Sequence, residues 1–179
     1  MIPFLTSPKI QIFENPKDSQ YLRLKHIIFP WEEQKADIGI LGIPWDEAIV
    51  AGGGRPGANE GPDAIRIALK QFGTTYFSDR NVDISSLKIV DFGNVEVVPG
   101  NTGETHEHVT ATLSDILERG IFPIILGGGH DSSFATLRAL ARHVDSLEGS
   151  ILMRILMFEK QKMKSLRAEL HFEKLWKNS

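Results

Sequence analysis

The stretch PIILGGGHDSSFATLRALARH, Pro123 to His143, decides the fold. An apolar run ends in three glycines, and a histidine and an aspartate follow directly before a segment with helical periodicity. A strand, a tight turn and a helix in this order form the repeating unit of an α/β sheet. The turn has three possible explanations: a metal ligand, His130, at the tip of a strand, a phosphate cradle, or a tight turn that a histidine merely follows.

Two similar units precede this stretch. Asp37 to Ile43 and Leu87 to Gly93 are apolar runs typical of strands that are covered on both faces. Helices are predicted after them, beginning at residue 61 and spanning residues 102–120, and residues 121–126 form a third strand. This alternation predicts right-handed βαβ units and a parallel sheet between helical layers, which is a three-layer αβα fold of the α/β class. Ligands bind beyond the carboxyl ends of the strands in such sheets.

The ends and faces of the helices can also be predicted. Thr102 or Thr105 can cap the second helix, and Gly120 ends it. The third helix, over residues 131–144, is expected to carry its apolar residues on one side, which consists of Phe134, Leu137, Leu140 and Val144.

Composition excludes several classes of protein. The net charge of −3 gives no electrostatic reason to expect a nucleic-acid partner. The amino terminus has no basic segment followed by an apolar one, and no apolar run approaches ~20 residues, so we expect neither secretion nor a membrane span. Cysteine is absent, which excludes disulfides and thiolate metal sites and fits a cytoplasmic protein.

The chain has two compositional halves that meet near Ser150. Residues 151–179 hold seven Lys or Arg and three Glu, a net charge of +4, so that residues 1–150 carry −7. All 16 glycines and all 9 prolines lie at or before Ser150. We therefore predict an α/β domain over residues 1–150 and an atypical basic, helical tail over residues 151–179.

The loop AGGGRPGANEGPDAIR, which follows the first strand, is the candidate substrate-binding segment. Arg55 can bind a carboxylate through two parallel hydrogen bonds, and Asn59 is the second candidate in this loop. An ordinary irregular connection is the competing explanation.

His106 and His108 are two residues apart on a predicted helix, so they cannot easily share a metal ion, and we expect both to be solvated.

The motifs GIPWDEAIVAGGGRPGANEGPDAIR and ILGGGHDSS together resemble the amino-terminal half of the ureohydrolases: arginase, agmatinase and formimidoylglutamase. The Gly-Gly-Gly-His-Asp form is most similar to formimidoylglutamases, and the resemblance covers roughly residues 35–150. It implies an arginase-like fold and a hydrolase in which two Mn²⁺ ions activate water to attack a linear amidine, such as formiminoglutamate, agmatine or arginine. It also implies a homo-oligomer as a possible assembly, and it matches His130 to the first metal ligand.

The remaining ligands of the family are not found in this sequence. The resemblance calls for an Asp-x-His-x-Asp segment on the next strand and a further aspartate pair, yet no aspartate follows Asp145. The general base and the other catalytic residues cannot be placed. We therefore expect a truncated chain that is inactive alone and does not retain Mn²⁺.

The tail suggests how the ligands were lost. One set of codons for residues 151–159, ILMRILMFE, reads Phe-Asp-Ala-His-Phe-Asp-Val-Arg in another frame, which matches the missing ligand segment. A natural or sequencing frameshift near Ser150 is our explanation. Alternatively, the tail is a genuine amphipathic helix that caps the sheet edge or recruits a partner, and the chain is a non-catalytic interaction module.

Overall fold

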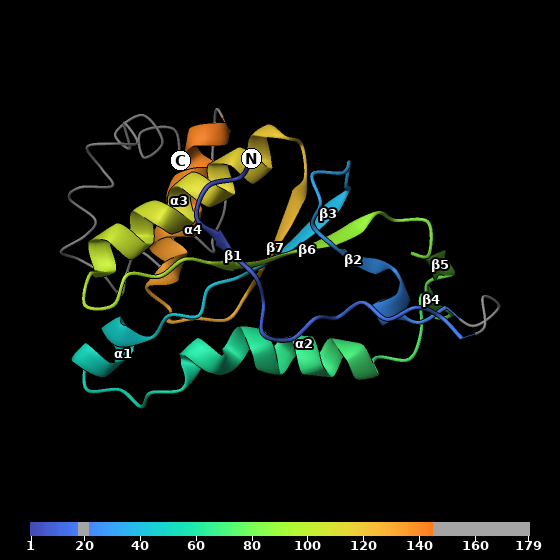
Figure 1. Ribbon diagram of the computed structural model, residues 1–179, viewed down its shortest axis with the longest axis horizontal. Helices are drawn as coiled ribbons and strands as arrows, with labels where there is room; N and C mark the ends of the chain where they lie inside the picture. The colour runs from blue at the N-terminus through green and yellow to red at the C-terminus, as the bar shows by residue number, and fades with distance from the viewer. Residues whose placement is uncertain (18–21, 145–179) are drawn as a thin grey trace.

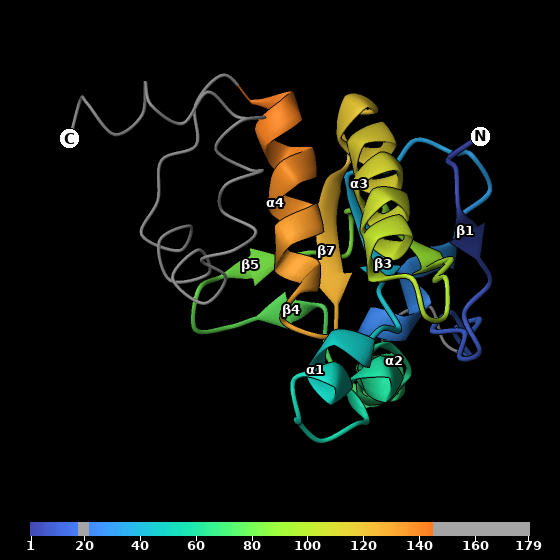
Figure 2. The same ribbon diagram turned by 90° about the vertical axis from the view of Figure 1, so that its left-hand side faces the viewer.

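The computed structural model describes residues 1–17 and 22–144. The main strands are β1 (Leu5–Thr6), β2 (Ile28–Pro30), β3 (Ile38–Gly42), β6 (Ile89–Val95) and β7 (Phe122–Leu126), and β4 (Tyr76–Phe77) and β5 (Val82–Asp83) form a separate two-stranded sheet. The α-helices are α1 (Glu47–Ala51), α2 (Gly61–Gln71), α3 (Thr102–Glu118) and α4 (Ser132–His143), and two 3-10 turns span Leu24–His26 and Ala58–Glu60. Helices α3 and α4 cover one face of the main sheet, and α1 and α2 lie on the other (Figure 1; Figure 2). This arrangement confirms the predicted three-layer αβα fold.

The sheet is built around β3. Strand β3 lies between β6 and β7 and is parallel to both, with Ile38 opposite Ile89 on one side and Phe122 on the other. Strand β2 is also parallel to β6, but β1 is antiparallel to it, so the sheet is mixed rather than wholly parallel. The carboxyl ends of β3, β6 and β7 meet at one edge, where the sequence predicted a site.

Side chains alternate between the two faces of each strand, and this alternation separates two apolar clusters. Leu41 and Val90 belong to the cluster that also contains Val109 and Ile116 of α3. Ile40 and Ile89 belong to the other cluster, against which Leu69 of α2 packs. Both faces of the central strands are therefore buried, as expected for continuous apolar runs between helical layers.

The amino-terminal segment is tied to the lower helical layer by a carboxylate with two cationic partners. Glu14 accepts a hydrogen bond from Lys25 Nζ at 2.5 Å, and Lys70 Nζ of α2 lies 2.9 Å from its other oxygen. Hydrogen bonds from Lys25 and then Lys70 lower the pKa of Glu14 to about 2.

Two details of the helices differ from the prediction. The side chain of Asn101 caps α3 by accepting from the backbone N–H of Glu104, so the prediction of Thr102 or Thr105 was wrong. In α4 the predicted apolar side is only half-buried, and the buried side consists of Ser132, Ala135, Arg138 and Ala139. Small residues allow α4 to approach α3 closely, and this contact outweighs the apolar stripe.

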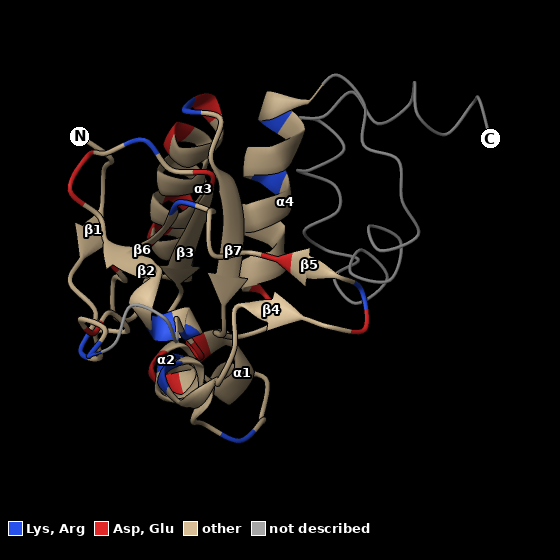
Figure 3. Ribbon diagram, turned by 90° about the vertical axis from the view of Figure 1, so that its right-hand side faces the viewer, with Lys and Arg blue, Asp and Glu red and all other residues tan. Residues whose placement is uncertain are grey.

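Strand β7 is an open edge within the described part of the chain. It pairs with β3, and no other described strand pairs with it. Phe122 and Ile124 are 67% and 41% exposed, and β7 carries no charged residue (Figure 3). Such an uncharged apolar edge is prone to pair with other chains.

None of the described helices is long and apolar enough to cross a membrane. The predicted tail over residues 151–179 lies outside the described residues.

Candidate functional site

The candidate site lies where the carboxyl ends of β3 and β7 meet. The two following segments are joined by backbone hydrogen bonds, from Ile43 N to Leu126 O at 3.1 Å and from Gly129 N to Trp45 O at 2.5 Å. Trp45 is almost fully buried, so it anchors the turn to the core. The loop after β3 therefore fixes one side of the turn that presents His130.

The glycines of this turn serve a close backbone approach. Gly127 and Gly128 have φ values of 61° and 91°, which are costly for other residues. A Cβ atom on Gly127 would lie 2.7 Å from Cδ of Pro62, and one on Gly128 would lie 2.5 Å from the carbonyl oxygen of Ile43. The turn thus packs directly against the start of α2 and the end of β3.

The phosphate-cradle explanation is not favoured by the hydrogen bonds of the turn. The backbone N–H of Ser132 donates to Gly129 O, that of Ser133 to His130 O and that of Phe134 to Asp131 O. The first amides of α4 are therefore already used within the turn and do not point freely at an anion.

His130 lies at the tip of the turn, at the carboxyl end of β7, and is exposed. Imidazole is a good ligand for manganese, so the position and the donor fit a metal ligand. However, residues 1–17 and 22–144 contain no group of three or more histidine, aspartate or glutamate side chains that could hold a metal ion. The described donors therefore do not fit a two-metal centre, and no catalytic step can be assigned to them.

His106 is not solvated, which corrects the sequence prediction. It is 4% exposed, and its Nε2 lies 2.8 Å from Oδ2 of Asp131. His108 is half-buried: it stacks on Phe4 at 3.8 Å between ring centroids, and its Nδ1 lies 2.9 Å from the carbonyl oxygen of Glu96. The two histidines therefore make different contacts.

The predicted substrate-binding residues lie on the loop between α1 and α2. Arg55 and Asn59 are both exposed. This loop is anchored by buried Asp46, whose Oδ2 accepts from the backbone N–H of Gly57 at 2.7 Å. Because the loop follows β3, both candidates belong to the same end of the sheet as His130.

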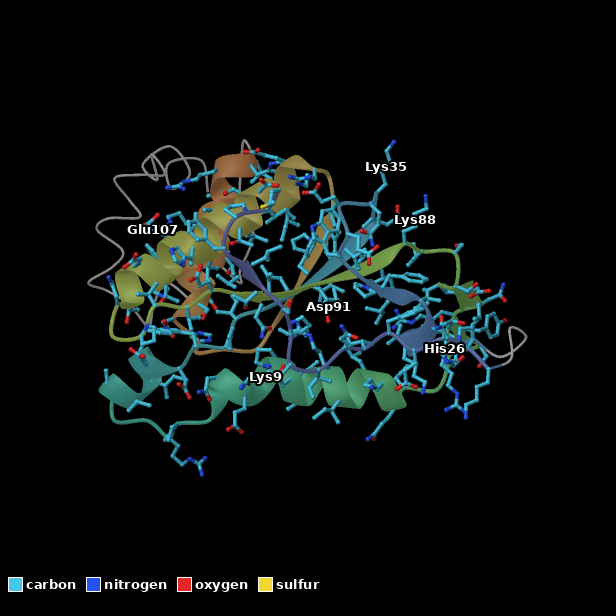
Figure 4. The ribbon with its side chains drawn as sticks, viewed as in Figure 1. Lys9, His26, Lys35, Lys88, Asp91 and Glu107 are labelled. Carbon is cyan, nitrogen blue, oxygen red and sulfur yellow. The ribbon has the colours of Figure 1, made fainter. Side chains whose placement is uncertain are left out.

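Arg66 and Asp91 form a buried pair that sequence reasoning missed. Arg66 is fully buried, and its guanidinium donates two hydrogen bonds of 2.8 Å to the two oxygens of Asp91. It also donates to Asn94 Oδ1 and to the carbonyl oxygen of Gly93. Asp91 lies between the sheet and α2 (Figure 4). An aspartate inside an otherwise apolar strand was the sequence signal that could have revealed a buried partner.

Comparisons with known proteins agree with this fold. A model of the arginase family matches residues 36–153. Formimidoylglutamase from Cupriavidus pinatubonensis is 34% identical over 108 residues, covering 60% of this chain and 31% of that protein. N(1)-aminopropylagmatine ureohydrolase from Thermococcus kodakarensis is 33% identical over 111 residues, covering 61% and 37%.

The solved structures give the same result. Trypanosoma cruzi formiminoglutamase, solved with Mn²⁺, superposes with a TM-score of 0.64 and 38% identity, over 70% of this chain and 41% of that one. The chain thus spans about two fifths of that protein and about a third of the curated relatives it matches. Since the family match covers more than half of the 179 residues, the chain belongs to the arginase family.

Proposed function

We propose that this chain is the amino-terminal portion of a manganese-dependent hydrolase of linear amidines, of the formiminoglutamate type, in the cytoplasm. The observation that carries the proposal is the position of His130, which the glycine turn presents at the carboxyl end of β7 beside the end of β3. Relatives whose names denote formimidoylglutamase and a ureohydrolase support amidine hydrolysis as the reaction class. Arginine and agmatine are the competing substrates, and Arg55 and Asn59 are the proposed substrate-binding residues.

We further propose that the chain as written has no hydrolytic activity alone. Two hard divalent cations need several oxygen and nitrogen donors, and the described residues do not bring three such donors together. The relatives are about three times as long as the matched segment, so most of their sequence has no counterpart in this match.

Metal content and turnover test this proposal together. The purified full chain is incubated with Mn²⁺, dialysed and analysed for bound metal, and then assayed with formiminoglutamate, agmatine and arginine. We expect less than one retained Mn²⁺ per chain and no product. Two tightly held Mn²⁺ ions with turnover of any of the three amidines would refute the inactivity.

The gene sequence tests the family function itself. If its codons near Ser150 give the ligand segment in another frame, the frame-restored protein is compared with its His130→Ala variant. We expect the restored protein to hydrolyse formiminoglutamate in preference to the other two amidines and the variant to lose both manganese and activity. Full activity of the variant would remove His130 from the metal site, and codons incompatible with the second frame would end the frameshift explanation.

A non-catalytic interaction module is the second candidate. The exposed apolar edge of β7 favours it, because a partner strand could pair there. A purified chain that melts cooperatively as a monomer would support a module, whereas rapid aggregation would support a truncated domain. Homo-oligomerisation stays a prediction.

A further inference from the structure

We propose that His106 is a positioning residue whose hydrogen bond to Asp131 fixes the turn that presents His130. The inference rests on the proposed function only in taking His130 as a metal ligand. The observation behind it is that His130 lies between two neighbours that are both anchored. The backbone N–H of Gly129 donates to Trp45 O, and the side chain of Asp131 meets that of His106.

The side chain of Asp131 bonds to His106 and does not cap α4. It occupies the N-cap position of α4, where an aspartate normally accepts from the helix backbone, yet it makes no such cap hydrogen bond. Its carboxylate instead meets Nε2 of His106 at 2.8 Å, and both side chains are only 6% exposed. A buried carboxylate depends strongly on its hydrogen-bond donors, so removal of this imidazole is costly.

His106 is itself held firmly between α3 and α4. Its carbonyl oxygen accepts from Thr110 Oγ1 at 2.8 Å and from Arg138 Nη2 at 3.0 Å. The Thr110 hydroxyl lies 3.1 Å from Ala135 O, and Arg138 Nε donates to that hydroxyl at 2.9 Å. The ring of Phe134 lies 5.9 Å from the imidazole, between centroids. The backbone of His106 is therefore held in place, and its imidazole lies beside Phe134, where it meets Asp131.

Backbone hydrogen bonds from Ser132 and Ser133 join the turn to α4, and the side chain of Asp131 adds an anchor to α3. Gly127 and Gly128 have left-handed backbones, and glycine restricts its own conformation least of all residues. The bond from Gly129 to Trp45 fixes the β3 side of the turn, and the bond from Asp131 to His106 fixes the other side. With both anchors in place, the backbone at His130 is held in position before any metal binds.

The test compares three variants of the full chain. His106→Phe keeps a ring and removes the donor, whereas His106→Gln keeps an N–H donor. His108→Phe is the matched control, since His108 lies on the same helix but contacts Phe4 and Glu96. Hydrogen exchange of the backbone amides is measured at residues 128–133 and along α3 and α4, and broadening of the His130 ring signal is followed by NMR as Mn²⁺ is added.

We expect His106→Phe to speed exchange at residues 128–133 about tenfold, the effect of one lost hydrogen bond, and to weaken Mn²⁺ broadening at His130 several-fold. His106→Gln should restore most of both, and His108→Phe should change neither. Unchanged exchange in the turn, or a uniform rise over α3 and α4 without rescue by glutamine, would overturn the proposal. If Mn²⁺ fails to broaden His130 in the unaltered chain while the exchange results hold, the metal-ligand function fails and the positioning of the turn stands.

Discussion

Replacing Arg66 by methionine should destabilise the protein by about 4 kcal/mol. Removing one partner of a buried ion pair costs roughly 3–5 kcal/mol, because the other charge is left without compensation. Arg66 is fully buried, and in the variant Asp91 would keep the backbone N–H of Gly93, at 2.9 Å, as a donor. The acceptors of Asn94 and Gly93 would also lose a donor. Methionine fills much of the space of the arginine stem, so a cavity contributes little.

The double variant Arg66→Met, Asp91→Leu separates the charge from the packing. Replacing both members of a buried ion pair by apolar residues leaves no uncompensated charge and is often close to neutral. The Gly93 N–H and the acceptors of Asn94 and Gly93 still lose their partners. We therefore expect a loss smaller than that of Arg66→Met alone. Arg66→Lys keeps the charge but not the forked geometry and should lose roughly 1–3 kcal/mol.

Urea unfolding measures these differences. Tryptophan emission, to which the 2% exposed Trp45 contributes, reports the tertiary structure, and far-UV circular dichroism reports the secondary structure. A total stability of about 5–15 kcal/mol is typical of domains, so Arg66→Lys keeps the series measurable if Arg66→Met does not fold. A loss below about 0.5 kcal/mol in Arg66→Met, or a double variant less stable than the single one, would refute the reasoning.

Three further predictions concern the helical layers and the open edge. Asn101→Ala should destabilise the protein by about 1 kcal/mol through loss of the α3 cap, while Thr102→Ala should cost less; urea unfolding compares them. The pKa of Glu14 is lowered to about 2 on folding. Ionised Glu14 therefore stabilises the fold above the ordinary carboxyl pKa, and this contribution disappears as pH falls toward 2. Glu14→Gln should make the melting temperature less dependent on pH between pH 5 and pH 2, by a small, salt-sensitive amount. Ile124→Lys should reduce self-association in sedimentation, whereas Ile67→Lys, on exposed α2 surface, should not; equal effects would argue against pairing through β7.

The elements of the fold were predictable where the signal is local. The apolar runs that became β3, β6 and β7 are bounded by turn residues, and the helices between them have clear periodicity. Strands β1 and β2 have two and three residues and no measurable period, so no local pattern marks them.

The errors at the helices have specific causes. Asparagine and threonine are both common at or near helix caps, which is true of Asn101, Thr102 and Thr105 alike. Backbone geometry rather than residue type decides which of them caps α3. In α4 the apolar stripe indicated the wrong buried side, because the contact with α3 is made through Ala135, Ala139 and the hydrogen-bonded Arg138. A hydrophobic pattern does not identify helix faces that bury small or paired polar residues.

The polar pairs of the site could not be predicted, since each joins residues 25 positions apart. Arg66 and His106 look like surface residues of amphipathic helices. Only the packing of α2 on the sheet and of α3 against α4 brings them to Asp91 and Asp131. A buried aspartate in or next to a strand indicates that a donor exists, but not which helix supplies it.

Among the described residues, the open edge of β7 and the lack of a group of three metal donors have a common geometrical origin. In a parallel sheet a site is assembled from the ends of neighbouring strands, and here His130 follows the last strand that the described residues contain. On the β3 side the space beside the turn is already filled by Trp45 and the start of α2. If His130 binds a metal ion, as we propose, further ligands would reach it mainly from the side of β7 that no described strand covers. A segment that pairs with this edge would then cover Phe122 and Ile124 and deliver donors at the same time.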